Sequence, residues 1–228
     1  REGHRAGVEA LRRIVKESSD LGVHHLTVFS FSTENWGRPR TEVSFLMSLL
    51  ERYIESDLAD LHSEGVRVRV IGRREGLSKK ICSLIDRAES LTANNNRLFL
   101  QIAFNYGGRE ELADAASRLA RRAANGTLDP ESINADVLAA ELLTAGMPNP
   151  DVIIRTSGES RLSNFMLWQS AYAELISPMF YGRIFHAPIW KPRLPFTLTE
   201  TAVSAWCRPP ANWIDWRAGG YGGRTGKI

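Results

Sequence analysis

Three short polar segments of this sequence combine arginine with small hydroxyl or amide residues. They are residues 32–39 (STENWGRP), 105–109 (NYGGR) and 155–165 (RTSGESRLSNF). Each one follows directly on a stretch with the pattern of a β-strand. In an open parallel sheet the carboxyl ends of the strands share one edge, and ligands bind outside that edge. Because a guanidinium group bonds two phosphate oxygens at once, the three segments predict a site for an anionic ligand.

The third segment has the composition of an anion site. Arg155 and Arg161 flank a Thr-Ser-Gly turn, and Ser163 stands where it can cap a predicted helix over 162–172 or bond a phosphate. The N–H groups at a helix start and two arginines together favour negative charge. A solvent-exposed run of charge would not need the turn, so we favour an anion site.

The first two segments also have purely structural interpretations. Residues 32–39 can form a turn that packs its tryptophan, but a turn alone does not need a carboxylate, an amide and a guanidinium together. We therefore favour a ligand site there. The paired glycines of residues 105–109 permit a tight turn into the next helix, and for this segment a structural turn and a ligand-facing turn both remain open.

Two further residues complete the candidate site. His4 lies between two glycines at the start of the first predicted helix, where an imidazole can meet an anion. Glu174 is either a surface charge or a ligand for Mg²⁺, since hard oxygen donors suit that ion. Arginines and carboxylates at one sheet edge suggest a diphosphate with its Mg²⁺. The sequence has no Ser-His-Asp order, zinc-ligand spacing, GxxxxGK[ST] or GxGxxG, which argues against common hydrolases, P-loop NTPases and dinucleotide enzymes.

The elements that must position these residues alternate between strand and helix. This order predicts an α/β fold, an open and mainly parallel sheet with helices on both faces. Strands are expected at 24–32, 66–71, 98–104 and 151–154. Helices are expected at 4–20, 41–64, 77–91, 109–124, 134–145 and 162–172. No element is predicted after residue 176, where prolines and paired glycines interrupt any period.

Overall composition is that of a globular protein. The chain has 228 residues, 43% of them hydrophobic and 24% charged, which suffices for one core without disulfide staples and excludes wholesale disorder. No apolar stretch is long enough to span a membrane. Cys82 and Cys207 lie far apart without a CxxC spacing, so we expect a cytoplasmic protein with free thiols.

The last 52 residues differ in composition from the rest. Residues 177–228 hold seven lysines and arginines against two acidic residues, and four of the six tryptophans, whereas residues 1–176 hold 22 basic against 24 acidic residues. A basic tail is one way to bind nucleic acid or an anionic membrane. Its aromatic and basic residues do not interleave as nucleic-acid binding requires, so we expect no nucleic-acid partner. We expect one domain over 1–176 and an atypical tail over 177–228.

The three segments resemble the motifs of the cis-prenyltransferases, above all the bacterial undecaprenyl diphosphate synthases. The matching patterns are FSTENWxRP at 31–39, NYGGR at 105–109 and RTxGExRLSNFxLWQxAYxE at 155–174. The resemblance implies a transferase that adds isopentenyl diphosphate repeatedly to farnesyl diphosphate with cis geometry and with Mg²⁺ as cofactor. It further implies a homodimer, a lipid-carrier precursor for cell-wall synthesis as product, and peripheral membrane contact through that lipid.

The resemblance also implies roles for single residues. Asn35 matches the residue credited with proton removal, with Ser32 beside it, and His4 matches a diphosphate contact. The other matches are the substrate loop at Thr33, Glu34, Trp36 and Arg38, the isopentenyl diphosphate site at Arg155, Arg161, Leu162 and Ser163, and a Mg²⁺ ligand at Glu174. Apolar side chains of the helices at 41–61 and 77–91 are expected to line a dry tunnel for the product. Each CH₂ buried there contributes about 0.8 kcal/mol.

One departure from the family's pattern concerns the start of the domain. The family opens with a strand that runs into Asp-Gly-Asn-Gly-Arg-Trp, which carries the aspartate and arginine of the allylic diphosphate site, and this sequence contains no such segment. We therefore expect the first strand to be missing and the chain as written to be inactive. The alternative is a non-catalytic subunit or diphosphate-binding relative. Retention of the motif residues disfavours it, since a subunit freed from chemistry need not keep them.

A second departure begins at residue 176. The family continues with a segment like Phe-Thr-Asp-Val-Leu-Trp-Pro-Asp-Phe, whereas residues 176–185 read ISPMFYGRIF. These residues can be encoded as ATT TCA CCG ATG TTC TAT GGC CGG ATT TTC. Omission of the first two bases gives TTC ACC GAT GTT CTA TGG CCG GAT TTT, which encodes the family's segment. We therefore predict a frameshift near codon 176, with the frame recovered by the Tyr-Gly-Gly at 221–223.

Overall fold

The computed structural model of the chain describes the backbone of residues 2–155, 159–177 and 202–206. Side chains are described for residues 11–155 and 159–177. The side chain of His4, which belongs to the first helix, therefore lies outside the described residues.

One sheet organises the described part of the chain, with its strands in the order β2-β3-β1-β6-β4-β5. The strands are β1 (His25–Ser32), β2 (Val66–Ile71), β3 (Leu98–Tyr106), β4 (Val152–Arg155), β5 (Glu174–Ile176) and β6 (Ala202–Trp206). Strands β2, β3 and β1 run parallel, and so do β4 and β5. Strand β6 is antiparallel to both β1 and β4, so β1 and β4 point the same way. The predicted mainly parallel sheet is confirmed.

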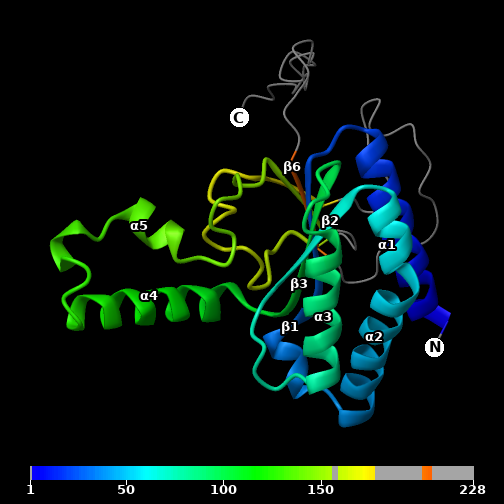
Figure 1. Cartoon of the computed structure of the whole chain (residues 1–228), viewed down its shortest axis with the longest axis horizontal. Coiled ribbons are helices and arrows are strands. Elements are labelled where there is room, and N and C mark those ends of the chain that lie inside the picture. The colour runs from blue at the N-terminus through cyan, green and yellow to red at the C-terminus, as the bar shows by residue number, and fades with distance from the viewer. Residues whose placement is uncertain (1, 156–158, 178–201, 207–228) are drawn as a thin grey trace, which may run out of the picture.

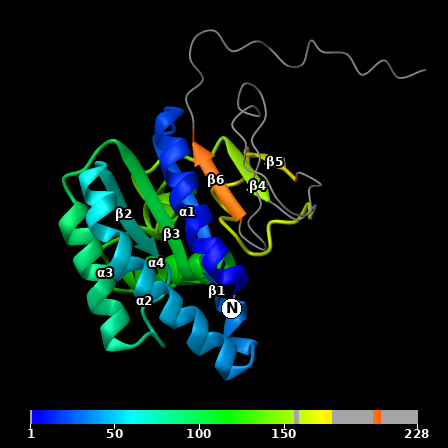
Figure 2. The ribbon, with the colours of Figure 1, turned by 90° about the vertical axis from the view of Figure 1, so that its right-hand side faces the viewer.

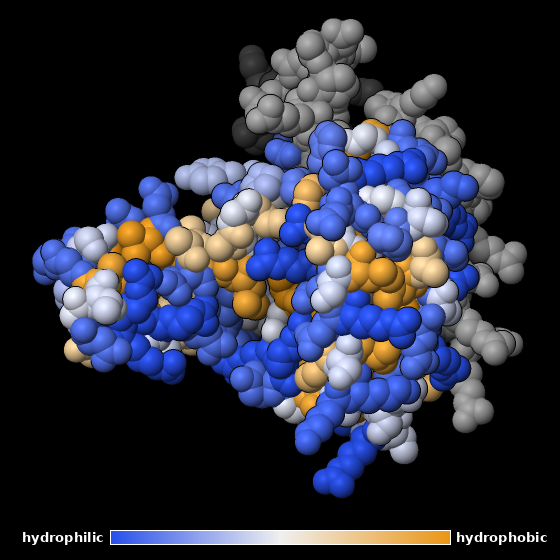
Figure 3. Space-filling view, in the orientation of Figure 1, coloured by the Kyte–Doolittle hydropathy of each residue, from blue (hydrophilic) through white to orange (hydrophobic). Residues whose placement is uncertain are grey.

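Helices α1 (Glu2–Asp20), α2 (Arg40–Ser63) and α3 (Lys79–Thr92) cover one face of this sheet, as Figures 1 and 2 show. Their apolar stripes bury Ile14, Ile54 and Ile85 against strand residues such as Leu100. The side chain of Ser78 accepts a hydrogen bond from the backbone N–H of Ile81 and so begins α3. Figure 3 shows that the opposite, outward surface of the helices is mostly hydrophilic, with apolar residues visible in places between them.

The other face of the sheet carries a smaller apolar cluster. Ile71, Ala103, Tyr106, Phe165 and Met166 form it. Helix α4 (Gly108–Ala124) begins beside this cluster and, with α5 (Ala135–Ala140), extends away from the sheet (Figure 1). The second layer therefore consists of the first turns of α4 and of the loop segments that follow α5 and β4.

A hydrogen-bonded network ties this second layer to β3. The Tyr106 hydroxyl donates to Glu111 on α4 at 2.6 Å, and Gln169 donates to the same carboxylate at 3.1 Å. The backbone N–H of Leu143 donates to the other oxygen of Glu111 at 2.8 Å. Burial, followed by the nearby charge of Glu111, raises the pKa of Tyr106 far above its usual range. The tyrosine therefore stays protonated as a donor to the carboxylate.

Most of the expected elements are confirmed within a few residues of their expected ends. The helix expected at 162–172 is wrong, because the structure has a series of turns there, and the helix expected at 134–145 is shortened to α5. Strands β5 and β6 were not expected. Residues 202–206 (AVSAW) lack a long period, but five small or β-branched and aromatic residues suffice when two flanking strands supply the hydrogen bonds.

Two further expectations concern membrane-spanning segments and the residues after 176. Among the helices of the described ranges, none combines the length and the apolarity needed to cross a membrane. Strand β6 places five residues of the 177–228 segment inside the sheet. The domain boundary near 176 and the frameshift stay predictions.

Candidate anion-binding site at the sheet edge

The three polar segments meet at one edge of the sheet. They follow β1, β3 and β4, which end at Ser32, Tyr106 and Arg155 and run in one direction. Hydrogen bonds join the segments pairwise: Trp36 Nε1 donates to Asn105 Oδ1 at 2.7 Å, and Asn164 Nδ2 donates to Glu34 Oε1 at 2.8 Å. The expected convergence of the three segments at a carboxyl edge is thus seen in the structure.

Arg155 is the centre of the third segment. Its side chain is only 14% exposed and forms an ion pair with Glu159. Its Nη1 donates to the carbonyl oxygen of Arg161 and to Oγ of Ser163, each at 2.6 Å. Arg161 Nη2 binds the same Glu159 carboxylate at 2.5 Å. Two guanidinium groups therefore bind one carboxylate, as they would bind a phosphate group, and the Ser163 hydroxyl accepts from one of them.

The expected helix start at this site is wrong. Ser163, Asn164 and Met166 have φ values of 49°, 63° and 44°, which lie in the left-handed region and stop a right-handed helix. The turn places Leu162 partly buried, with its carbonyl accepting from Phe165 N at 3.1 Å. Among the described residues, the third segment therefore offers arginine and serine side chains but no helix N-terminus.

The first segment folds into a short 3₁₀ helix, Thr33–Gly37, capped by Ser32. Ser32 Oγ accepts from Glu34 N at 3.3 Å, and the backbone N–H of Ser32 donates to Asn35 Oδ1 at 2.9 Å. This reciprocal box fixes the Asn35 amide at the carboxyl end of β1. Arg38 ends the segment and pairs with Glu42 of α2 at 2.5 Å.

The Glu34 carboxylate faces the site in its ionised form. Partial burial opposes ionisation, but hydrogen bonds from Ser32, its own backbone, Asn164 and Thr33 outweigh it and lower the pKa of Glu34. The hydroxyl of Ser32 donates to Glu34 Oε2, and Thr33 Oγ1 lies 3.3 Å from that oxygen. Thr33 and Glu34 are thereby joined in one polar group beside Asn35.

Two asparagines were overlooked as site residues, although both lie inside the motifs. The buried Asn105, at φ 52°, accepts from Trp36 and donates to the carbonyls of Arg73 and Glu75 at 2.8 and 2.9 Å. Asn164 contacts both other segments. Asparagine tolerates a positive φ better than most residues, but no periodicity in the sequence marks such positions, so the sequence analysis gave them no role.

Glu174 does not lie with the other residues. It is the first residue of β5 and pairs with Val152, the first residue of β4. Val152 precedes Arg155 by three residues, which is roughly 10 Å along a strand. The Glu174 side chain is exposed. Nowhere in the described ranges do three His, Cys, Asp or Glu side chains gather as a metal site would need. The described residues therefore do not build a Mg²⁺ site around Glu174.

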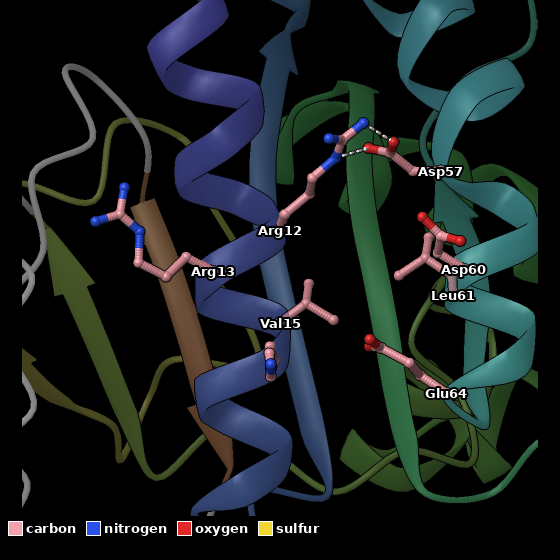
Figure 4. A pocket seen from close by; sticks show the side chains of 8 residues that line it. Arg12, Arg13, Val15, Asp57, Asp60, Leu61 and Glu64 are labelled. Atoms are coloured by element: carbon pink, nitrogen blue, oxygen red, sulfur yellow. Dashed lines mark hydrogen bonds and ion pairs between the residues drawn. The ribbon is translucent and has the colours of Figure 1, made fainter.

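A cavity of about 320 Å³ lies away from this edge, between α1 and α2. Figure 4 shows Arg12 bonded to Asp57 across it, with Val15 and Leu61 also on its walls and Asp60 and Glu64 along α2. Helix α3 contributes no residue to its lining. The tunnel expected between the second and third long helices is therefore not this cavity, and it stays a prediction.

The fold and the candidate site define an α/β protein that gathers two arginines at the carboxyl edge of its sheet. A family model described as putative undecaprenyl diphosphate synthase, a prenyltransferase family, matches residues 1–186. The chain belongs to this family, as the sequence motifs indicated.

Named relatives agree with this membership. Isoprenyl transferase 2 of Bradyrhizobium diazoefficiens is 57% identical over 175 residues, which are 77% of this chain and 69% of the relative. The isoprenyl transferase of Agrobacterium fabrum is 54% identical over 174 residues, 76% of this chain and 70% of the relative.

Solved structures show the same fold. Lavandulyl diphosphate synthase from Lavandula x intermedia, crystallised with dimethylallyl diphosphate, is 34% identical with a TM-score of 0.76, covering 78% of this chain and 77% of that one. A probable undecaprenyl diphosphate synthase from Campylobacter jejuni is 31% identical with a TM-score of 0.67, covering 76% and 79%.

Proposed function

We propose that this site condenses isopentenyl diphosphate onto farnesyl diphosphate, extending it to a long cis-polyprenyl diphosphate of the undecaprenyl class for cell-wall synthesis. The observation that carries the proposal is the Arg155, Arg161 and Ser163 cluster, in which two guanidinium groups bind the Glu159 carboxylate and the Ser163 hydroxyl accepts from Arg155. The solved lavandulyl relative holds a diphosphate ester, which supports a diphosphate as the ligand class. Mg²⁺ is the cofactor that membership of the family implies, and when bound it would supply positive charge to the diphosphate.

The role proposed for each residue follows from its position at the sheet edge. Arg155 and Arg161 bind the diphosphate of isopentenyl diphosphate, with Ser163 as a further hydrogen-bonding group. The C–O bond of the allylic diphosphate breaks, a C–C bond forms at the allylic carbon, and one proton leaves the isopentenyl part. The Asn35 amide, held by Ser32, accepts or guides that proton. Trp36 is 41% exposed and covers the substrate from the loop side.

A chimera tests this function on residues 1–176. These residues are flanked by the N-terminal and C-terminal segments of the Bradyrhizobium relative, and labelled isopentenyl diphosphate is supplied with farnesyl diphosphate and Mg²⁺. We expect incorporation into long-chain product, and a loss of about 10²-fold in turnover on Asn35→Ala, since proton transfer contributes on that order. Asn125→Ala, at the exposed end of α4, is the matched control and is expected to keep full turnover.

A non-catalytic diphosphate-binding relative is the alternative. A folded chimera that binds isopentenyl diphosphate without incorporating it would support that alternative and contradict a transferase site. For the 228-residue chain itself, whose sequence contains no Asp-Gly-Asn-Gly-Arg-Trp, inactivity stays the expectation, and we propose that it nevertheless binds isopentenyl diphosphate. Cytoplasmic placement and membrane contact through the product belong to the same proposal.

We also propose a homodimer that uses the β5 end of the sheet. Strand β5 is the last strand in the sheet order. Its residues Leu175 and Ile176 are 38% and 45% exposed, and Tyr172, just before it, is 94% exposed. An apolar edge strand is a template for pairing with another chain. We expect a dimer in sedimentation experiments and a monomer for Leu175→Lys, whereas Leu91→Lys, at a similarly exposed leucine on α3, should leave the dimer intact. A monomeric unmodified chain would contradict the interface.

A further inference from the structure

Asn164 is the one residue of the third segment, among those described, that bonds to both other segments. Its Nδ2 donates to Glu34 Oε1 at 2.8 Å and to Glu110 Oε2 at 3.0 Å. Its Oδ1 accepts from the backbone N–H of Arg109 at 2.8 Å, and its carbonyl accepts from Gly108 N at 2.7 Å. Both ends of the side-chain amide are therefore used, one toward the Asn35 loop and α4, the other toward the start of α4.

The chemistry of this position requires an amide. Two carboxylates, Glu34 and Glu110, share the two protons of one Nδ2 group, so a neutral donor keeps two negative charges close together. A carboxylate at position 164 would add a third negative charge and remove both donors. The φ of 63° also restricts the choice, since Asn, Asp and Gly adopt this conformation more readily than other residues.

Two glycines make room for this arrangement. A Cβ on Gly107 would lie 2.1 Å from Glu110 Oε2, 2.6 Å from Thr33 Oγ1 and 2.8 Å from Asn164 Nδ2. A Cβ on Gly108 would lie 3.1 Å from the carbonyl oxygen of Asn164. The paired glycines thus serve the contact between the segments as well as the turn.

Ser163 and Asn164 are consecutive in the chain but bind different loops. Ser163 Oγ accepts from Arg155, while Asn164 holds Glu34, the neighbour of Asn35 in the chain. We propose that Asn164 is a positioning residue that holds the loop carrying Asn35 in register with the arginine loop that binds the diphosphate. This inference rests on the proposed function for its consequence in binding, but the contact itself can be tested without ligand.

The test uses the full 228-residue chain in four forms: unmodified, Asn164→Asp, Asn164→Gly and Asn164→Asp with Glu110→Gln. The aspartate variant keeps the shape and the favoured backbone but removes the donors. The glycine variant keeps the left-handed backbone alone. In the double variant the new glutamine amide can donate to the introduced aspartate and neutralises one charge. Asn134→Asp, at the cap of α5 where an oxygen acceptor suffices, is the matched control.

Two readouts separate positioning from folding. The first is acrylamide quenching of Trp36 fluorescence, obtained by subtracting the emission of each variant that also carries Trp36→Phe. The second is the Kd for isopentenyl diphosphate with Mg²⁺, measured by calorimetry. We expect Asn164→Asp and Asn164→Gly to raise Trp36 quenching and to raise the Kd about tenfold, as the loss of one charged hydrogen bond does. The double variant should recover most of both, and Asn134→Asp should match the unmodified chain.

The outcomes distinguish the two proposals. Unchanged Trp36 quenching in Asn164→Asp and Asn164→Gly, with both folded, would overturn the positioning role. Failure of Glu110→Gln to rescue the aspartate variant would overturn the shared-amide arrangement. If the unmodified chain binds no isopentenyl diphosphate while the Trp36 differences persist, the proposed function fails and the positioning contact stands.

Discussion

Replacement of Arg155 by glutamine is expected to weaken binding of isopentenyl diphosphate by the 228-residue chain about a hundredfold, because two charge-assisted hydrogen bonds of about 1.5 kcal/mol each are lost. Arg155 is the least exposed of the cations at the sheet edge that we assign to substrate, at 14% against 67% for Arg161. Low exposure strengthens its interaction with an anion. Titration calorimetry in the presence of Mg²⁺ measures the effect.

Two further variants sharpen this result. Arg155→Lys keeps the charge but loses the planar fork, so an intermediate affinity is expected. Arg121→Gln removes an exposed arginine on α4 that bonds only to Ser117 among the described side chains, and it should leave the affinity unchanged. Equal affinities for Arg155→Gln and the unmodified chain would remove Arg155 from the diphosphate site.

Gly72→Ala is expected to cost at least about 3 kcal/mol of folding free energy, because both the backbone conformation and the available space forbid a side chain. Gly72 has a φ of 131°, and a Cβ there would lie 1.9 Å from the carbonyl oxygen of Phe104 and 2.9 Å from that of Asn105. Phe104 and Asn105 belong to β3. Because β3 is hydrogen-bonded to a strand on each side, its backbone cannot move away from an added Cβ. Urea denaturation measures the loss.

Gly126→Ala is the matched control for this effect. Gly126 has a φ of 70°, but a Cβ there would meet no atom within 4 Å, so the substitution is expected to cost only the conformational strain of about 1 kcal/mol. Similar losses at the two glycines would show that strain alone, without the contact to β3, explains the effect. A greater loss at Gly72 would also indicate that the turn at 72–75 is rigid. This turn supplies the two carbonyls that Asn105 binds, and Asn105 in turn accepts from Trp36.

Sequence reasoning located the site because its geometry is a consequence of topology. Alternation of strands and helices predicts a parallel sheet, and a parallel sheet brings the residues after β1, β3 and β4 to one edge. The arginines of the third segment and the amide of the first follow from residue type. None of this needs tertiary detail, and the solved structures of relatives show the same fold.

The remainder depends on contacts between distant residues. The segment 162–172 has helical spacing of apolar residues, but Asn164 must reach Glu34 and Gly108, and the left-handed turn that achieves this overrides the local preference. Strand β6 could not be expected from its five residues, since its hydrogen bonds come entirely from β1 and β4. Glu174 was placed by motif alone, and the register of β5 against β4 is a property of the pairing.

Strand β6 has a consequence for the distance between the two halves of the site. It stands between β1, which carries the Asn35 loop, and β4, which carries Arg155. Neighbouring strands lie about 4.8 Å apart whether they run parallel or antiparallel, so β1 and β4 are separated by two such steps, roughly 9.5 Å. The middle strand thus works as a spacer whose thickness is set by backbone hydrogen bonding. The distance between the Asn35 loop after β1 and the Arg155 loop after β4 is therefore insensitive to the side chains and the direction of the strand between them.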